Sequence, residues 1–388
     1  MSELSKVQEI VRTRTVSVLG LDPFSWYKEM RESDPIHFEP EGNLWELFKY
    51  EDIQKVLSNP AIFSSGRGRP DAQAGGNIML LDPPRHQELR ALVSQVFTPR
   101  IISRMSERIV TIVNNLFDSN VRDGRLDVIT DLAYPLPVIV IAEMLGIPSA
   151  ERDNFKRWSD AVVGTSPKEA ADASMALTSY FQAVLAERRR KPGEDLVSAL
   201  LSAEINGTPL TDREIIDFCI LLLVAGNETT TNLIGNAIWC FDDFPDTFSQ
   251  LRAEPTLLPS AIEEVLRFRS PVQRATRNAL VDTEVNGQPI KAGQIIFCWI
   301  GSANRDETGF PQSEVFDIRR NSQRHLAFGY GIHFCLGASL ARLETKLTLE
   351  CMLERFSTIR RVRDIPLQPI TSFFGYGVKH LPVMLTTR

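Results

Sequence analysis

Residues 328–337, FGYGIHFCLG, place a histidine and a cysteine among three glycines, directly before a segment with helical periodicity. The N-terminus of a helix offers unpaired N–H groups and the positive end of the helix dipole, so we expect a lowered thiol pKa for Cys335. Glycine lets the backbone turn tightly and approach a flat molecule closely. A thiolate in such a loop suits either a nucleophile or a metal ligand.

The surroundings of Cys335 favour the metal ligand. A cysteine nucleophile needs a general base beside it, and His333, two residues away in a loop, rarely forms such a pair. For iron, one thiolate is enough if a porphyrin supplies four nitrogens.

A second candidate lies in the 35 residues between Pro209 and Pro245, which contain no proline and are mostly apolar at helical spacing. They predict a helix of roughly 50 Å. Its middle, AGNETTT at 225–231, consists largely of poor helix formers, and a threonine hydroxyl can bond the carbonyl one turn back and bend the helix. A distorted polar turn there suggests a place where a small molecule fits and protons move. The alternative is a tolerated kink with solvated polar groups.

Two further pairs are weaker signals on their own. Glu264 and Arg267 are three apart on a predicted helix and can form an ion pair, although most such pairs are surface bridges. His86 and Arg90, four apart after Pro83-Pro84, could together grip an anion, or could form an ordinary solvated basic face.

Composition limits the class of protein. The 388 residues carry 43 Lys+Arg and 49 Asp+Glu, a net charge of -6, which argues against nucleic acid as a partner. The N-terminus has no apolar signal segment, and the nine apolar residues from Phe218 to Gly226 are too few to span a membrane. We therefore expect a cytoplasmic protein. Five cysteines without CxxC spacing disfavour a disulfide framework or a four-cysteine zinc site.

Periodicity predicts one mainly helical domain over 1–388, with minor β structure and an extension at 1–20. The expected helices are 51–58, 86–96, 98–119, 136–145, 149–163, 168–191, 211–242, 255–269 and 337–355. The expected strands are 36–39, 44–49, 281–285, 288–290 and 294–299, with further short strands in 366–388. Asn286-Gly287 predicts a two-residue hairpin turn, and 64–77 reads as a surface loop.

Together these stretches resemble the cytochrome P-450 family of haem-thiolate monooxygenases. The cysteine loop matches that family's Phe-x-x-Gly-x-His-x-Cys-x-Gly pattern in full, at Phe328, Gly331, His333, Cys335 and Gly337. The helix motif resembles its (Ala/Gly)-Gly-x-(Asp/Glu)-Thr-Thr, matched by Ala225, Gly226, Glu228, Thr229 and Thr230. Glu264 and Arg267 match Glu-x-x-Arg, and SANRDETGFPQSEVFDIRR resembles the meander, in which Arg320 completes a Glu-Arg-Arg cluster.

The resemblance implies a P-450 fold in which a long central helix lies over a buried haem b. Cys335 would be the axial ligand, in a loop with Phe328 and Gly337, and Ala225 would lie against the cofactor. The propionates would be held by His86, Arg90, Arg277 and His333. Glu228 and Thr229 would form the acid–alcohol pair that delivers protons, while Glu264, Arg267 and Arg320 would be structural.

The implied reaction is hydroxylation of an apolar small molecule, of the fatty-acid, terpenoid or steroid type, by a soluble monomer. It would use O2 and electrons from a ferredoxin and its reductase. The pocket residues implied by position are Ile78, Met79, Leu222, Ala225, Thr229, Val272 and Phe374, and the lid would be 64–77 with the helices near 150–190. Arg100, Arg104, Arg342 and Lys346 would lie on the face where an acidic ferredoxin docks.

Three rival functions remain. A peroxide-driven peroxygenase typically replaces the acid–alcohol pair by Arg and Pro, whereas this chain keeps Glu228 and Thr229. A non-catalytic haem sensor usually carries an output domain, and no such segment is visible in the sequence. A zinc hydrolase using His333 and Cys335 lacks further ligands at usable spacing.

Overall fold

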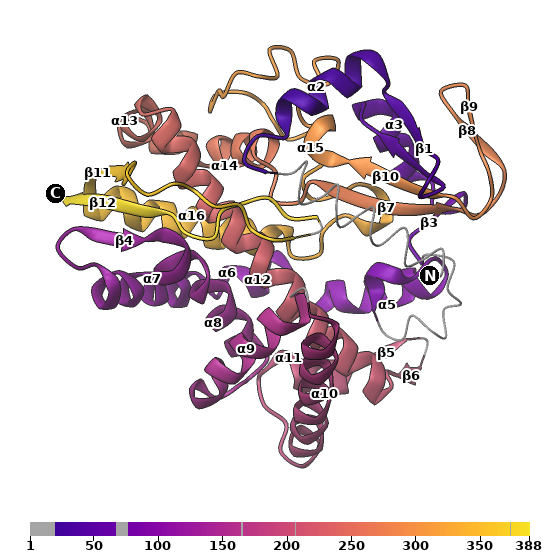
Figure 1. The fold of residues 1–388 in the computed structure, drawn as a ribbon. Coiled ribbons are helices and arrows are strands. Elements are labelled where there is room, and N and C mark those ends of the chain that lie inside the picture. The colour runs from indigo at the N-terminus through magenta and orange to yellow at the C-terminus, as the bar shows by residue number, and fades with distance from the viewer. Residues whose placement is uncertain (1–19, 67–76, 164–165, 206, 373) are drawn as a thin grey trace.

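The computed structural model describes residues 20–66, 77–163, 166–205, 207–372 and 374–388. Helices fill the larger part of the molecule, and a small sheet lies at one side together with α2, α3 and α15 (Figure 1). The principal helices are α2 (Phe24–Ser33), α3 (Tyr50–Ser58), α5 (Arg85–Val96), α6 (Pro99–Ser103), α7 (Ser106–Asn120), α8 (Pro135–Met144), α9 (Arg152–Val163), α10 (Pro167–Arg190), α11 (Leu196–Leu201), α12 (Asp212–Asp243), α13 (Asp246–Ala253), α14 (Leu258–Phe268), α15 (Ile300–Ala303) and α16 (Ala338–Arg355).

Helix α12 runs through the middle of the molecule and packs against α8, α10 and α16 (Figure 1). It begins with a capping box in which Thr211 and Glu214 satisfy each other's backbone N–H groups. Among the described residues it is the one helix long and apolar enough to cross a membrane, but 56% of its most apolar window is buried inside the protein. Such burial is typical of a helix in the core of a protein.

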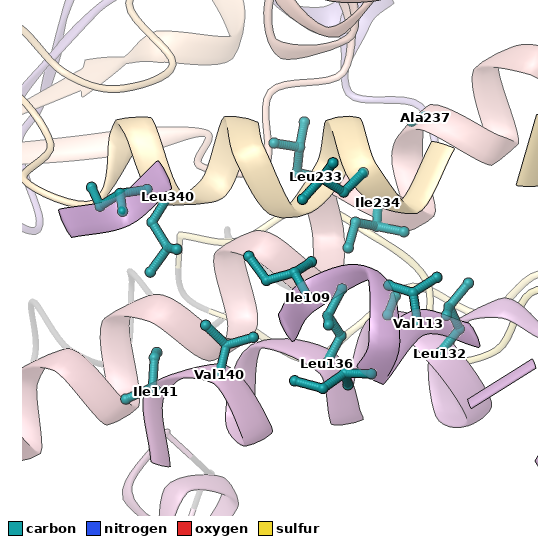
Figure 2. Close-up of a cluster of buried hydrophobic side chains, with 14 of the residues drawn as sticks. Ile109, Val113, Leu132, Leu136, Val140, Ile141, Leu233, Ile234, Ala237 and Leu340 are labelled. Atoms are coloured by element: carbon teal, nitrogen blue, oxygen red, sulfur yellow. The ribbon is translucent and has the colours of Figure 1, made fainter. Parts of the chain in front are cut away.

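The helical core forms where α12 meets α7, α8 and α16. Leu233 and Ile234 of α12 lie opposite Val113 of α7 and Leu136 of α8 in the cluster that Figure 2 shows. Gly226 permits close packing of α12 on α8, because a Cβ at this position would lie 2.5 Å from Cδ1 of Ile141.

The sheet joins distant parts of the chain in the order β1-β2-β10-β7-β3. β1 pairs with β2 and β7 with β10 in antiparallel fashion, β3 pairs antiparallel with β7, and β2 runs parallel to β10. The strand bounds are β1 (Ile36–Glu39), β2 (Leu44–Leu47), β3 (Phe63–Ser64), β7 (Arg274–Ala279) and β10 (Ile295–Trp299). A second sheet, in the order β11-β12-β4, combines β11 (Phe356–Arg361), β12 (Pro382–Thr387) and β4 (Arg125–Asp127). Short hairpins are formed by β5 (Glu204–Ile205) with β6 (Thr208–Pro209), and by β8 (Thr283–Val285) with β9 (Gln288–Ile290).

Several predicted elements are confirmed. Asn286 and Gly287 both have positive φ, 45° and 82°, in the turn between β8 and β9. The long central helix and the final helix begin within a residue of the predicted positions.

Other predictions are wrong in detail. The single helix expected at 98–119 is two helices, because α6 ends at Ser103 and α7 begins at Ser106. The helices expected from 149 and from 255 start with 3-10 turns at Ser149–Glu151 and Pro255–Leu257. Helices α2, α11 and α13 and strands β4, β7 and β11 were not predicted as elements. Most of the expected loop 64–77 lies outside the described residues.

Candidate active site at the Cys335 loop

Cys335 lies in the long connection between α15 and α16, two residues before the N-cap Gly337. The 3-10 turn Gly331–His333 precedes it, and the backbone N–H of Cys335 donates to the carbonyl of Phe328 at 2.8 Å. The loop is therefore closed on itself, and its half-buried thiol is held at the start of a helix.

Gly331 is required where this loop passes the end of α3. Its φ is +70°, and a Cβ would lie 2.7 Å from the carbonyl oxygen of Leu57. Gly329 also has a positive φ, +73°. Both conformations favour glycine, because other residues rarely adopt positive φ. Glycine is thus required at positions 329 and 331 by the backbone conformation of the loop.

The thiol itself has an unfavourable environment for charge. Burial raises the pKa of Cys335, and this effect outweighs the lowering caused by the N–H groups of Gly337 and Ala338 and by the nearby Arg90 and Arg342 guanidinium groups. The expected lowering of the thiol pKa is therefore wrong for the free side chain. The helix start supplies the predicted N–H groups, but desolvation is the larger effect.

Four basic or imidazole side chains gather beside this loop from three parts of the chain. His86 and Arg90 come from α5, His333 from the cysteine loop and Arg277 from β7. The rings of His86 and His333 lie 4.3 Å apart between centroids, and Arg90 donates to the carbonyl of Phe334 at 2.7 Å. Burial, followed by the charges of Arg277, His86 and Arg90, lowers the pKa of His333 to about 3.

The negative charge nearest to this cluster is that of Asp82, which acts to raise the pKa of His86 and of Arg277 without forming an ion pair with either. Within the described parts of the chain, no carboxylate forms an ion pair with any of the four side chains. His86 Nδ1 and His333 Nε2 are buried without a hydrogen-bond partner. Burial also lowers the pKa of Arg90 and of Arg277. Because buried polar groups are normally paired, the arrangement suits a ligand that brings its own anionic groups.

The polar turn of α12 remains helical. Helix α12 is continuous from Asp212 to Asp243, so the polar turn at 225–231 does not interrupt the helix. The Thr229 hydroxyl donates to the Ala225 carbonyl at 2.9 Å, the bond one turn back that the sequence suggested. This bond gives the hydroxyl a partner within the helix.

Comparison with known proteins gives the family. The cytochrome P450 family model matches residues 138–386. Cytochrome P450 109 of Bacillus spizizenii is 44% identical over 379 residues, covering 94% of this chain and 92% of that protein. The crystal structure of substrate-free CYP109E1 from Bacillus megaterium has a TM-score of 0.90 at 42% identity, covering 95% of this chain and 100% of that chain.

This chain belongs to the cytochrome P450 family. It is a P450 monooxygenase, and the family implies a haem iron cofactor. CYP109E1 also has a structure in complex with testosterone, which matches at a TM-score of 0.88 and 42% identity, covering 94% of this chain and 98% of that chain. Erythromycin C-12 hydroxylase of Saccharopolyspora erythraea is 38% identical over 373 residues, covering 92% of this chain and 93% of that protein. The P450 fold and family inferred from the motifs are thus confirmed.

The residues of this P450 fit a haem. The unpaired nitrogen atoms of His86 and His333 and the two arginines are groups that would bind two propionates. A thiol whose pKa burial raises needs a metal cation to become a stable thiolate. The flat cofactor therefore matches the glycine-rich loop, the single sulfur ligand and the uncompensated basic cluster.

The Glu-x-x-Arg pair of the P450 is fully buried. Arg267 donates to both Glu264 oxygens at 2.7 Å, and each side chain is 0% exposed. Arg320 joins them, with its Nε 3.3 Å from Glu264 Oε1, and Ser322 donates to Oε2 at 2.5 Å. Arg267 also donates to the carbonyls of Asn304 and Ser313. The structure brings together the three residues that the sequence grouped.

The expected pocket residues come from four segments. Ile78 is 5% exposed and packs in the helical core, whereas its neighbour Met79 is 55% exposed. Val272 forms an isolated bridge with Gly375, next to the partly exposed Phe374. In the middle of α12, Ala225 is exposed, while Leu222 and Thr229 are half-buried. The fold therefore brings the middle of α12 close to the segments that contain Val272 and Phe374. The roles of these residues in a substrate pocket stay predictions.

Sequence reasoning missed a second ion cluster next to the cysteine loop. Glu263 accepts two bonds of 2.7 Å from Arg342 and lies 3.1 Å from His325. Burial alone would raise the pKa of Glu263, but the bonds from Arg342 and His325 lower it to about 2. The Arg342 guanidinium lies 4.5 Å from the Phe328 ring centroid. The sequence did carry a signal for this cluster, because IEEVLRF has a second glutamate, Glu263, directly before Glu264.

Proposed function

We propose that this P450 hydroxylates an apolar small molecule of the fatty-acid, terpenoid or steroid type, using O2 and electrons from a ferredoxin and its reductase. The observation that carries the proposal is the half-buried Cys335 thiol beside four basic or imidazole side chains that form no ion pair with a described carboxylate. Those groups match the sulfur ligand and propionate sites that a haem-thiolate oxygenase needs.

The cofactor of the proposal is haem b. Cys335 would bind its iron through sulfur, with Phe328 and Gly337 shaping the loop, and His86, Arg90, Arg277 and His333 would bind its propionates. When bound, the haem supplies the iron at which O2 is activated for C–H hydroxylation. Glu264, Arg267 and Arg320 would stabilise the fold beneath this loop without contacting substrate.

In this proposal the proton-handling groups come from α12. Thr229 would orient a water molecule, which requires its hydroxyl to leave the Ala225 carbonyl or to accept while donating there. Glu228 would supply protons from outside the pocket. Burial raises the pKa of Glu228, and the Ser372 hydroxyl partly opposes this effect.

Steroids are the first substrates to test. The relative CYP109E1, whose structure in complex with testosterone is similar to this one, supports that choice. The proposed apolar lining is Ile78, Met79, Leu222, Ala225, Thr229, Val272 and Phe374. Binding of a steroid is expected to change the spin state of the ferric iron, which an absorption titration measures.

The proposed electron donor would dock on the face that carries the cysteine loop. Of the basic residues predicted for this face, Arg104 is exposed, while Lys346 pairs with Glu350 at 2.8 Å and Arg342 pairs with Glu263. The side chain of Arg100 lies outside the described residues. We further propose a cytoplasmic monomer with one domain over 1–388.

The decisive experiment is the absorption spectrum of the dithionite-reduced, carbon-monoxide-bound protein. A thiolate ligand at Cys335 predicts the thiolate-type carbonyl band in the natural protein and its loss in Cys335→Ala. The buried Cys351, which lies inside α16 near its C-terminal end, serves as the control, because Cys351→Ala is expected to keep the band. An unchanged band in Cys335→Ala would refute the assignment.

A further inference from the structure

The acidic residue of the central-helix motif is held by the C-terminal part of the chain. The Glu228 carboxylate lies beside the Ser372 hydroxyl, which lowers the pKa of Glu228. Its Oε1 lies 2.6 Å from the position that a Cβ at Gly375 would occupy, and Ser372 Oγ lies 2.8 Å from that same position. The Gly375 N–H donates to Ser372 Oγ at 3.0 Å. Since the serine oxygen accepts from Gly375, its own proton stays available for donation to the neighbouring Glu228 carboxylate.

The contact is part of a fixed interface. Residues 374–376 bond to the segment before β7, with Gln273 N–H donating to the Phe374 carbonyl at 2.7 Å and Tyr376 N–H donating to the Pro271 carbonyl at 2.8 Å. Two turns along α12 from Glu228, the Asn236 amide donates to the Tyr376 carbonyl at 3.1 Å. The same face of the helix therefore contacts this loop repeatedly, and the loop holds Ser372 against Glu228.

A cavity connects this interface with solvent. It has a volume of about 290 Å³ and is lined by Gly20, Gln368, Pro369, Ile370, Thr371, Ser372, Gly375, Tyr376, Gly377 and Lys379. Gln368, Thr371 and Lys379 are exposed, whereas Gly375 and Gly377 are buried. The cavity thus leads from exposed polar side chains to the two residues that touch the Glu228 carboxylate, and its volume is sufficient for on the order of ten waters.

We propose that this cavity is the entry route for protons and that the Ser372 hydroxyl passes them from cavity water to Glu228. The proposal rests on the monooxygenase function proposed above, in which Glu228 supplies protons. The Ser372 O–H bond breaks as an O–H bond forms on the carboxylate, and a hydronium ion in the cavity returns a proton to Ser372 Oγ and becomes water. The serine is unchanged, and Glu228 gains one proton, which rotation of its side chain carries toward Thr229.

The arrangement explains the residue types at both loop positions. Glycine at 375 leaves room for the carboxylate, because any Cβ would collide with both Glu228 Oε1 and Ser372 Oγ. A hydroxyl at 372 can accept and donate at the same time, which a relay group must do. Burial raises the pKa of Glu228, and Ser372 is the side chain whose hydrogen bond lowers it. Lys379 is the charged group at the cavity wall.

The test uses the holoenzyme with a substrate that it hydroxylates. Ser372→Ala is expected to lower product formed per NAD(P)H about 10-fold, since a cavity water replaces the hydroxyl only partly, and to raise both peroxide release and the solvent deuterium isotope effect. Ser372→Thr keeps the hydroxyl and is expected to restore coupling. The control is Thr371→Ala, which removes another hydroxyl from the same cavity and is expected to leave coupling unchanged.

A measurement without turnover tests the contact itself. Infrared difference spectra of the resting ferric protein, with Glu228→Gln to assign the carboxyl band, are expected to show a higher Glu228 pKa in Ser372→Ala, because the bond that lowers it is lost. If Ser372→Ala fails to yield holoenzyme, the isosteric Ser372→Thr and Ser372→Val pair makes both comparisons. Gly375→Ala is expected to reproduce the uncoupling.

Failure of this inference differs from failure of the proposed function. Natural coupling and an unchanged isotope effect in Ser372→Ala would overturn the relay, as would equal uncoupling in Ser372→Thr. If the natural protein shows no thiolate-type carbonyl band, the monooxygenase function fails, and the infrared result alone decides whether Ser372 controls Glu228.

Discussion

Glu344 offers a quantitative test of how this core treats a buried carboxyl group. It lies on α16, its side chain is 1% exposed, and its Oε2 is buried without a hydrogen-bond partner. Desolvation raises the pKa of Glu344 from 4.5 to about 8. The folded protein therefore keeps this carboxyl protonated at neutral pH, whereas the unfolded chain ionises it.

The sign and size of the effect follow from proton linkage. Between pH 4.5 and 8 the folded state holds a proton that the unfolded state has released, so the free energy of unfolding falls as pH rises. One pKa unit corresponds to about 1.4 kcal/mol, and at pH 7 the loss reaches about 3 kcal/mol. Glu344→Gln removes the titration but keeps the shape. We expect it to remove a slope of about 1.4 kcal/mol per pH unit between pH 5 and 8.

The assay is urea unfolding followed by far-UV circular dichroism at several pH values, with haem occupancy matched between variants. The control is Glu354→Gln on the exposed face of the same helix, which is expected to keep the slope of the natural protein. The prediction concerns the difference in slope, which is insensitive to the constant cost of the new amide. Parallel pH profiles for the natural protein and Glu344→Gln would refute a protonated carboxyl in the core.

Three other substitutions probe the site and its support. Arg267→Met leaves the fully buried Glu264 without its main partner and should destabilise the protein by about 3–5 kcal/mol in thermal unfolding, while normal stability would contradict a structural role for the pair. Gly331→Ala forces a side chain into positive φ against the Leu57 carbonyl and should cost about 1–3 kcal/mol, with Gly287→Ala as a control that shares positive φ but meets nothing within 4 Å. Thr229→Ala removes the hydroxyl next to Glu228 and should divert NAD(P)H from product to peroxide, and full coupling would exclude Thr229 from proton transfer.

The sequence predicted those parts of the fold whose signals are local. The β8–β9 hairpin follows from Asn286-Gly287, since both turn residues need positive φ. The length of α12 follows from its proline-free apolar pattern. In both cases neighbouring residues carry the information.

The parts that escaped prediction depend on distant partners. Strand β7, RATRNA, shows no alternation of apolar and polar residues, so its sequence does not look like a strand. Its arginines are nevertheless buried, and the Arg274 guanidinium lies 4.0 Å from the Phe297 ring centroid. The bond between Ser372 and Glu228 joins positions 144 residues apart, and nothing local to Ser372 announces it. Cys335, His333 and His86 could be assigned to one site only through the resemblance to a known family. The pKa of the Cys335 thiol depends on its burial, which no local sequence pattern indicates.

The parallel pairing of β2 with β10 has a consequence for biosynthesis. Leu44 of β2 pairs with Ile295, so this hydrogen-bonded neighbour emerges from the ribosome about 250 residues later. At the usual rates of translation the β1–β2 hairpin waits for roughly 10–50 s with an open edge. During that interval the nascent chain exposes a template for wrong strand pairing, so we expect its yield in cells to depend on chaperones that shield the first fifty residues.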